Sequence, residues 1–100
     1  MVVVEFSKNE KIEMLRITGH ANYASHGEDI VCAGISTLAY SIGNKILNLD
    51  EKFNLVVDEN EFLFKNNKDT DNINLLLETL YEGLLMIEHQ YPKNITFKEV

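Results

Sequence analysis

The chain contains a single cysteine, a single proline and no tryptophan among its 100 residues. A lone cysteine cannot form an internal disulfide bond. No early stretch combines a basic start, an apolar run and a small-residue cleavage site, as a secretion signal does. We therefore expect a reduced, cytoplasmic protein. The length and the 45% hydrophobic content predict one compact domain over residues 1–100.

Basic residues are also scarce. Only 9 Lys and Arg stand against 16 Asp and Glu, which gives a formal net charge of -7. Phosphate binding draws its affinity from clustered basic side chains, so no direct nucleic-acid binding is expected. A basic protein or peptide is the more natural partner. We find no apolar run that approaches the roughly 18 residues needed to cross a bilayer, so we expect no membrane association.

Hydrophobic periodicity predicts five strands and two helices. The strands form two hairpins and a closing strand, over residues 1–6, 11–18, 53–57, 61–65 and 94–100. Apolar residues at three- and four-residue steps predict helices over residues 30–49 and 69–91. The inward face of the second strand stays open, because both of its faces mix apolar and charged side chains. The order β-β-α-β-β-α-β predicts an α+β fold, with two helices packed on one face of a mixed β-sheet.

The stretch GHANYASHGEDIVCAG, residues 19–34, gathers the only cysteine and two of the three histidines. Asp29 precedes the first expected helix as its N-cap, so Cys32 falls in the first turn, beside N–H groups without a partner inside the helix. The positive end of the helix favours the thiolate. The Asp29 charge opposes it. A titration of thiol alkylation against pH would measure the net effect of the helix end and the Asp29 charge on the ionisation of Cys32.

Nucleophilic catalysis by cysteine needs a base within hydrogen-bond reach. His20 lies at the end of the second expected strand, on the rigid scaffold. His26 lies inside the segment that Gly19 and Gly27 bracket. We favour His20 as the base, and a contact between His26 and Cys32 stays open as the alternative.

Two further residues are expected to support the site. Asp29 is a candidate to fix the tautomer of the histidine, although capping alone also explains it. Ser36 follows Cys32 by one helical turn and is expected to face the same site. The N–H groups of Cys32 and its helical neighbours are candidate donors to an oxyanion. Each of these residues also has a purely structural explanation, since a free cysteine is often buried.

Metal and cofactor chemistry is not expected. His20, His26 and Cys32 are spaced by six residues, but this is not the compact pairing of zinc sites, and no second cysteine offers a fourth ligand. The glycines match neither phosphate-binding loop pattern. We therefore predict a site that works without a cofactor.

The segments GHA, residues 19–21, and GEDIVCAGIS, residues 27–36, resemble the signature of the ribosomal-processing cysteine proteases, the Prp family. Overall length, the hairpin before the histidine, and Tyr91 and Pro92 before a closing strand are also similar to that family. The resemblance implies a protease that removes a short N-terminal extension from a large-subunit ribosomal protein. It implies cleavage after an aromatic pair and before a small residue.

Carried over by position, the resemblance makes Cys32 the nucleophile and His20 the base, and it matches Asp29 and Ser36 to other characteristic positions. It also implies a mobile loop from Gly19 to Gly27 over the cleft, and a homodimer. Two alternatives remain from other classes. They are a ribosome-associated binding module with an unreactive cysteine, and a small metal-binding protein that uses the same His and Cys residues.

Overall fold

The computed structural model describes residues 1–25 and 28–100. Its elements, in chain order, are β1 (Val2–Asn9), β2 (Lys11–Thr18), α1 (Ile30–Leu49), β3 (Asn54–Asp58), β4 (Glu61–Lys65), α2 (Asp71–Gln90) and β5 (Ile95–Glu99). The predicted order β-β-α-β-β-α-β is confirmed.

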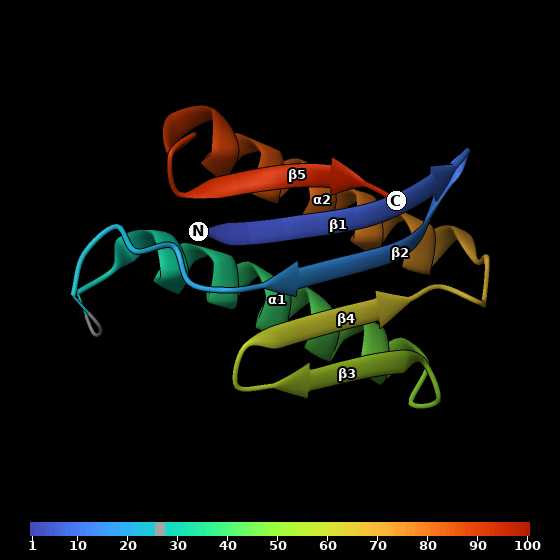
Figure 1. Cartoon of the computed structure of the whole chain (residues 1–100). Coiled ribbons are helices and arrows are strands. Elements are labelled where there is room, and N and C mark those ends of the chain that lie inside the picture. Colours follow the sequence, from blue (N-terminus) through green and yellow to red (C-terminus); the bar gives the residue numbers. More distant parts are fainter. Residues whose placement is uncertain (26–27) are drawn as a thin grey trace.

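The strands form one five-stranded sheet in the order β3-β4-β2-β1-β5. Neighbouring strands are antiparallel except β1 and β5, which run parallel. Both helices lie behind the same face of the sheet (Figure 1). The α+β class, the mixed sheet and the single helical layer are therefore confirmed.

The first hairpin has a tighter turn than predicted, and its pairing decides which face of β2 is buried. β1 extends to Asn9, so the turn consists of Glu10 alone, which has a φ of 65°. The register between β1 and β2 then skips Glu13. Such a bulge shifts the side-chain alternation by one position. Ile12 therefore joins Leu15 and Ile17 on the helix-facing side, where all three are buried.

Side-chain caps fix where both helices begin. Asp29 accepts hydrogen bonds from the first turn of α1, and Thr70 does the same for α2. The buried faces of the helices consist of Val31, Ile35, Ala39, Gly43 and Ile46 in α1 and Ile73, Leu77, Leu80 and Leu84 in α2. Leu49, which we predicted to continue the α1 stripe, is 47% exposed because it is the last helical residue, past the last buried turn.

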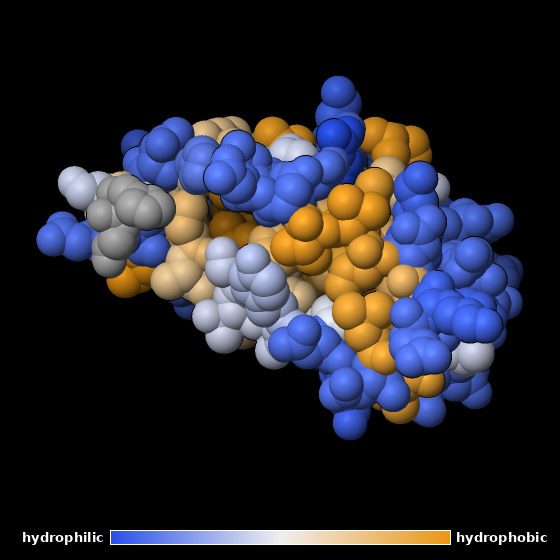
Figure 2. Space-filling model, turned by 90° about the horizontal axis from the view of Figure 1, so that it is seen from below, coloured by the Kyte–Doolittle hydropathy of each residue, from blue (hydrophilic) through white to orange (hydrophobic). Residues whose placement is uncertain are grey.

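By length and composition alone, α1 is apolar enough to cross a membrane, contrary to the sequence expectation. Its buried residues belong to the hydrophobic core, which they share with residues of the sheet. Figure 2 views the molecule from below, the side on which the edge strand β3 lies in Figure 1. Its Val56 and Val57 are 44% and 41% exposed, and apolar surface gathers between hydrophilic residues on the face shown there.

Candidate active site

The start of α1 is built around the Asp29 carboxylate. Its Oδ1 accepts hydrogen bonds from the N–H groups of Val31 and Cys32, at 3.0 and 2.9 Å. Its Oδ2 accepts from Tyr23 at 2.9 Å and from Ala24 at 3.4 Å. The predicted N-cap role of Asp29 is confirmed. The same carboxylate also anchors the segment that precedes the helix.

Two opposing effects set the ionisation of Asp29. Partial burial raises the pKa of this carboxyl, whereas backbone hydrogen bonds from Cys32, Tyr23, Ala24 and Val31 lower it, and the net pKa lies below its ordinary value. Asp29 is thus held as the anion. Every hydrogen bond found for its carboxylate in residues 1–25 and 28–100 comes from a backbone N–H, and none comes from His20.

The cap changes the expected source of oxyanion donors. The N–H groups of Val31 and Cys32 are bound to the Asp29 side chain, and that of Ala33 is bound to its backbone carbonyl at 3.0 Å. A strong N-cap satisfies the same orphan donors that an oxyanion would need. In this structure the first-turn donors that the sequence suggested are therefore already occupied.

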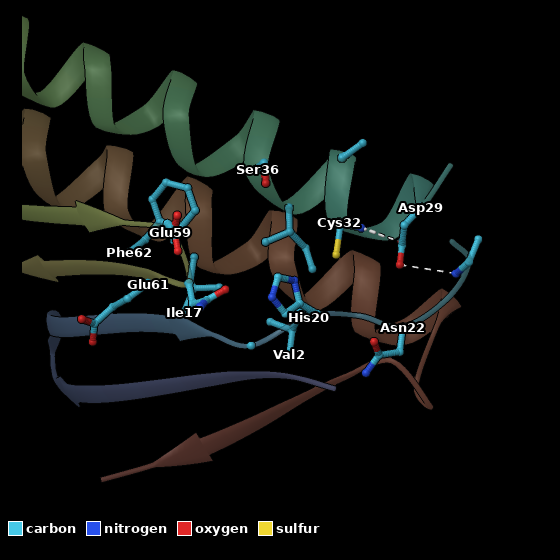
Figure 3. A pocket seen from close by; sticks show the side chains of 15 residues that line it. Val2, Ile17, His20, Asn22, Asp29, Cys32, Ser36, Glu59, Glu61 and Phe62 are labelled. Atoms are coloured by element: carbon cyan, nitrogen blue, oxygen red, sulfur yellow. Dashed lines mark hydrogen bonds between the residues drawn. The ribbon is translucent and has the colours of Figure 1, made fainter. Parts of the chain in front are cut away.

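Cys32 is half-buried on the side of α1 that faces the sheet. Its sulfur accepts a hydrogen bond from the backbone N–H of Ala21, with 3.3 Å between N and Sγ. Figure 3 shows the sulfur pointing away from the helix and into a cavity. The thiol is therefore neither sealed in the core nor fully exposed to solvent.

His20 lies two residues beyond the end of β2, slightly past its predicted place on the strand. Gly19 makes this position possible. It has a φ of +91°, and a Cβ there would lie 2.5 Å from the carbonyl oxygen of Met1. Its N–H donates to the carbonyl of Asn60 at 3.3 Å, which ties the end of β2 to the neighbouring hairpin. The exposed His20 side chain lines the same cavity as Cys32 (Figure 3).

The cavity has a volume of about 590 Å³. Ser36 lies on its wall one turn along α1 from Cys32 (Figure 3), so the two helical residues of the expected site and His20 share one space. The cavity residues are Val2, Ile17, Gly19, His20, Asn22, Ala24, Asp29, Cys32, Ala33, Ile35, Ser36, Glu59, Asn60, Glu61 and Phe62.

One wall of the cavity was missed by sequence reasoning. Glu59, Asn60 and Glu61 come from the turn between β3 and β4 and the start of β4. Thr18 pairs with Glu61, so this turn lies beside the end of β2. Only the strand order could have revealed this neighbour, because nothing in the hairpin's own sequence links it to His20.

Two residues of the expected site, His26 and Gly27, lie outside the described residues. Both alternatives that include His26, its contact with Cys32 and the zinc set of His20, His26 and Cys32, therefore depend on a residue outside the described ones. Residues 1–25 and 28–100 contain no group of three His, Cys, Asp or Glu side chains arranged to hold a metal ion.

A half-buried thiol at the start of a helix and an imidazole beyond a strand end line one cavity, and these are the two residue types that cysteine hydrolases combine. The fold that carries the site is a single layer of two helices on a mixed sheet.

Comparison with known proteins identifies the family. A family model described as "Cysteine protease Prp" matches residues 1–96. The chain is 34% identical over 101 residues to the ribosomal processing cysteine protease Prp of Staphylococcus aureus, covering 95% of each chain. It is 30% identical over 97 residues to that of Bacillus subtilis, covering 89% of this chain and 87% of the relative. The chain belongs to the Prp family of ribosomal processing cysteine proteases, as its sequence signature suggested.

A solved structure supports the same relationship. The S. aureus ribosomal processing protease Prp, in complex with a covalently linked product peptide, superposes with a TM-score of 0.91 at 28% identity and full coverage of both chains. The likeness therefore extends over all the secondary structure elements described above.

Proposed function

We propose that this protein cleaves a ribosomal protein precursor with Cys32 as the nucleophile and His20 as the general base. The observation that carries the proposal is that both side chains line one cavity, with the sulfur of Cys32 held by the N–H of Ala21. The covalently linked product peptide in the S. aureus relative supports a reaction that passes through a covalent enzyme intermediate.

The reaction then proceeds in two stages. His20 takes the thiol proton, and the thiolate of Cys32 attacks the scissile carbonyl carbon. The tetrahedral intermediate collapses to an acyl-enzyme as the C–N bond breaks, and His20 returns its proton to the leaving amine. In the second stage His20 takes a proton from water as the water adds to the acyl carbon; the C–S bond then breaks, and His20 returns that proton to the sulfur of Cys32.

The developing oxyanion needs donors that the cap of α1 does not already use. Apart from the proposed base His20, the neutral side chains with N–H or O–H donors on the cavity wall are those of Asn22, Ser36 and Asn60. The Ser36 hydroxyl lies one helical turn from Cys32. No metal ion or organic cofactor has a step in this scheme.

The proposed substrate is the N-terminal extension of a large-subunit ribosomal protein, cut after an aromatic pair and before a small residue. Val2, Ile17, Ile35 and Phe62 provide an apolar wall suited to aromatic side chains. The net charge of -7 favours encounter with a basic ribosomal protein.

We further propose that the protein acts in the cytoplasm as a homodimer. The resemblance to the Prp family supports the homodimer, and the unpaired cysteine supports a reducing compartment. Light scattering on the purified chain measures the oligomeric state. A monomer at micromolar concentration would contradict this part of the proposal.

The central test uses synthetic peptides that represent the N-termini of ribosomal proteins, incubated with the enzyme and analysed by mass spectrometry. Cys32→Ala is expected to abolish cleavage. His20→Ala is expected to slow it by about 100-fold or more, the usual contribution of a general base. His89→Ala is the matched control, because His89 is an exposed histidine in the last turn of α2, outside the cavity residues. Continued cleavage by purified Cys32→Ala would remove the nucleophile assignment.

A further inference from the structure

The sulfur of Cys32 has a hydrogen-bond partner that belongs to neither member of the proposed dyad. The backbone N–H of Ala21 donates to Sγ with an N–S distance of 3.3 Å. Hydrogen bonds to an ionised acceptor are about twice as strong as those to a neutral one. An N–H fixed in this position therefore stabilises the thiolate more than the thiol.

Ala21 is held in place from its other side by a residue far away in the sequence. Nδ2 of Asn94 donates to the Ala21 carbonyl at 2.9 Å, across 73 residues of chain. The Ala21 residue is only 1% exposed. Its methyl group, its carbonyl and its N–H are thus all engaged, which leaves the residue little freedom to turn its N–H away from the sulfur.

The backbone of Asn94 is itself firmly anchored. Its N–H donates to the carbonyl of Tyr91 at 3.0 Å, and its carbonyl accepts from the N–H of Val2 at 2.9 Å. The next residue, Ile95, is fully buried and begins β5. Asn94 therefore projects its side chain from a rigid junction between α2, β1 and β5.

We infer that Asn94 is a positioning residue for the reaction: through Ala21 it holds an N–H against Sγ of Cys32 and so favours the thiolate. Ala21 also directly follows His20, so the same contact steadies the backbone that carries the proposed base. The catalytic meaning of this inference rests on the proposed nucleophilic role of Cys32. The expected effect of Asn94 on the ionisation of the Cys32 thiol does not depend on that role.

The test measures the rate of iodoacetamide alkylation against pH for the wild type, Asn94→Ala and Asn66→Ala. Cys32 is the only cysteine, so the rate reports on this thiol alone. Asn66→Ala is the matched control, because Asn66 donates to the backbone carbonyl of Ile12 at 3.0 Å, also across a long sequence separation, but does not line the cavity. If both variants lose the same melting temperature, a difference between their alkylation curves cannot be due to a general loss of stability.

In Asn94→Ala we expect the midpoint of the alkylation curve to rise by roughly half to one pH unit, since a hydrogen bond to a charged group is weakened. In Asn66→Ala we expect no movement of the midpoint. An unchanged midpoint in folded Asn94→Ala, or an equal rise in both variants, would overturn the inference.

A second measurement needs no substitution at Asn94. In the wild type, the NMR signal of the Ala21 amide is expected to shift with the same midpoint as the alkylation curve, because its partner becomes an anion. If the Ala21 amide signal does not shift as the thiol ionises, the inference is contradicted, even if Asn94→Ala fails to fold. Neither measurement uses a peptide substrate, so failure here is distinct from failure of the proposed protease reaction.

Discussion

Substitution of Asp29 separates capping from catalysis more sharply than any other change in this site. Removal of an N-cap side chain costs about 1–2 kcal/mol of stability. For a domain of this size each kcal/mol lowers the melting temperature by about 4–8 °C. Asp29→Ala is therefore expected to melt roughly 5–15 °C below the wild type in a circular-dichroism scan at pH 7.

Asp29→Asn is the informative partner of that variant. Asparagine caps helices about as well as aspartate, so its Oδ1 can keep the bonds to Val31 and Cys32. Its amide nitrogen cannot accept the bonds that Tyr23 and Ala24 now donate to Oδ2. We expect the decrease in melting temperature to be less than half as large in Asp29→Asn as in Asp29→Ala. Equal losses in the two variants would refute the claim that the cap dominates.

The same variant addresses whether Asp29 orients His20. The described hydrogen bonds of the carboxylate all come from backbone N–H groups. Loss of an orienting acid in a catalytic triad costs on the order of 10⁴ in rate. We expect peptide cleavage by Asp29→Asn to fall by less than about 10-fold, because the cap is retained. A fall of a thousandfold or more in a folded protein would show that the orienting role is the correct one.

Two further predictions concern stability. The folded-state pKa of Asp29 is lowered, so its stabilising effect is present above the unfolded pKa and is lost as pH falls through the folded pKa. The difference in melting temperature between the wild type and Asp29→Asn should therefore narrow below about pH 4. A difference that widens in acid would contradict this prediction. Gly19→Ala places a Cβ 2.5 Å from the Met1 carbonyl oxygen at a φ of +91°, so urea unfolding should show a loss of at least about 2 kcal/mol; a loss below half of that would mean that the backbone relaxes without cost.

The sequence was a good guide wherever one element carried the whole signal. Asp29 was predicted as the N-cap of the first helix and is its N-cap in the structure, because capping is decided by residues within one turn. The shared cavity of His20 and Cys32 follows from a strand end meeting a helix start, which the element order already suggests. These features depend on short-range physics and are readable from short-range patterns.

Features that depend on register or on distant pairing were out of reach. The bulge at Glu13 changes which residues of β2 face the helices, and its strand shows apolar side chains on both faces. The wall formed by Glu59, Asn60 and Glu61 depends on β4 lying beside β2. The bond from Asn94 to Ala21 joins residues that only the finished fold brings together.

The two oxygens of Asp29 divide their hydrogen bonds between the helix and the segment before it. Within residues 1–25 and 28–100, Oδ1 accepts hydrogen bonds only from the helix, at Val31 and Cys32, and Oδ2 only from the preceding segment, at Tyr23 and Ala24. If a substrate displaces that segment, the bonds to Oδ2 break, but the cap that positions Cys32 persists. Hydrogen bonds contribute about 1 kcal/mol each, so breaking the two bonds to Oδ2 costs about half of what breaking all four would cost. With this division, displacement of the preceding segment would leave in place the helical turn that carries Cys32.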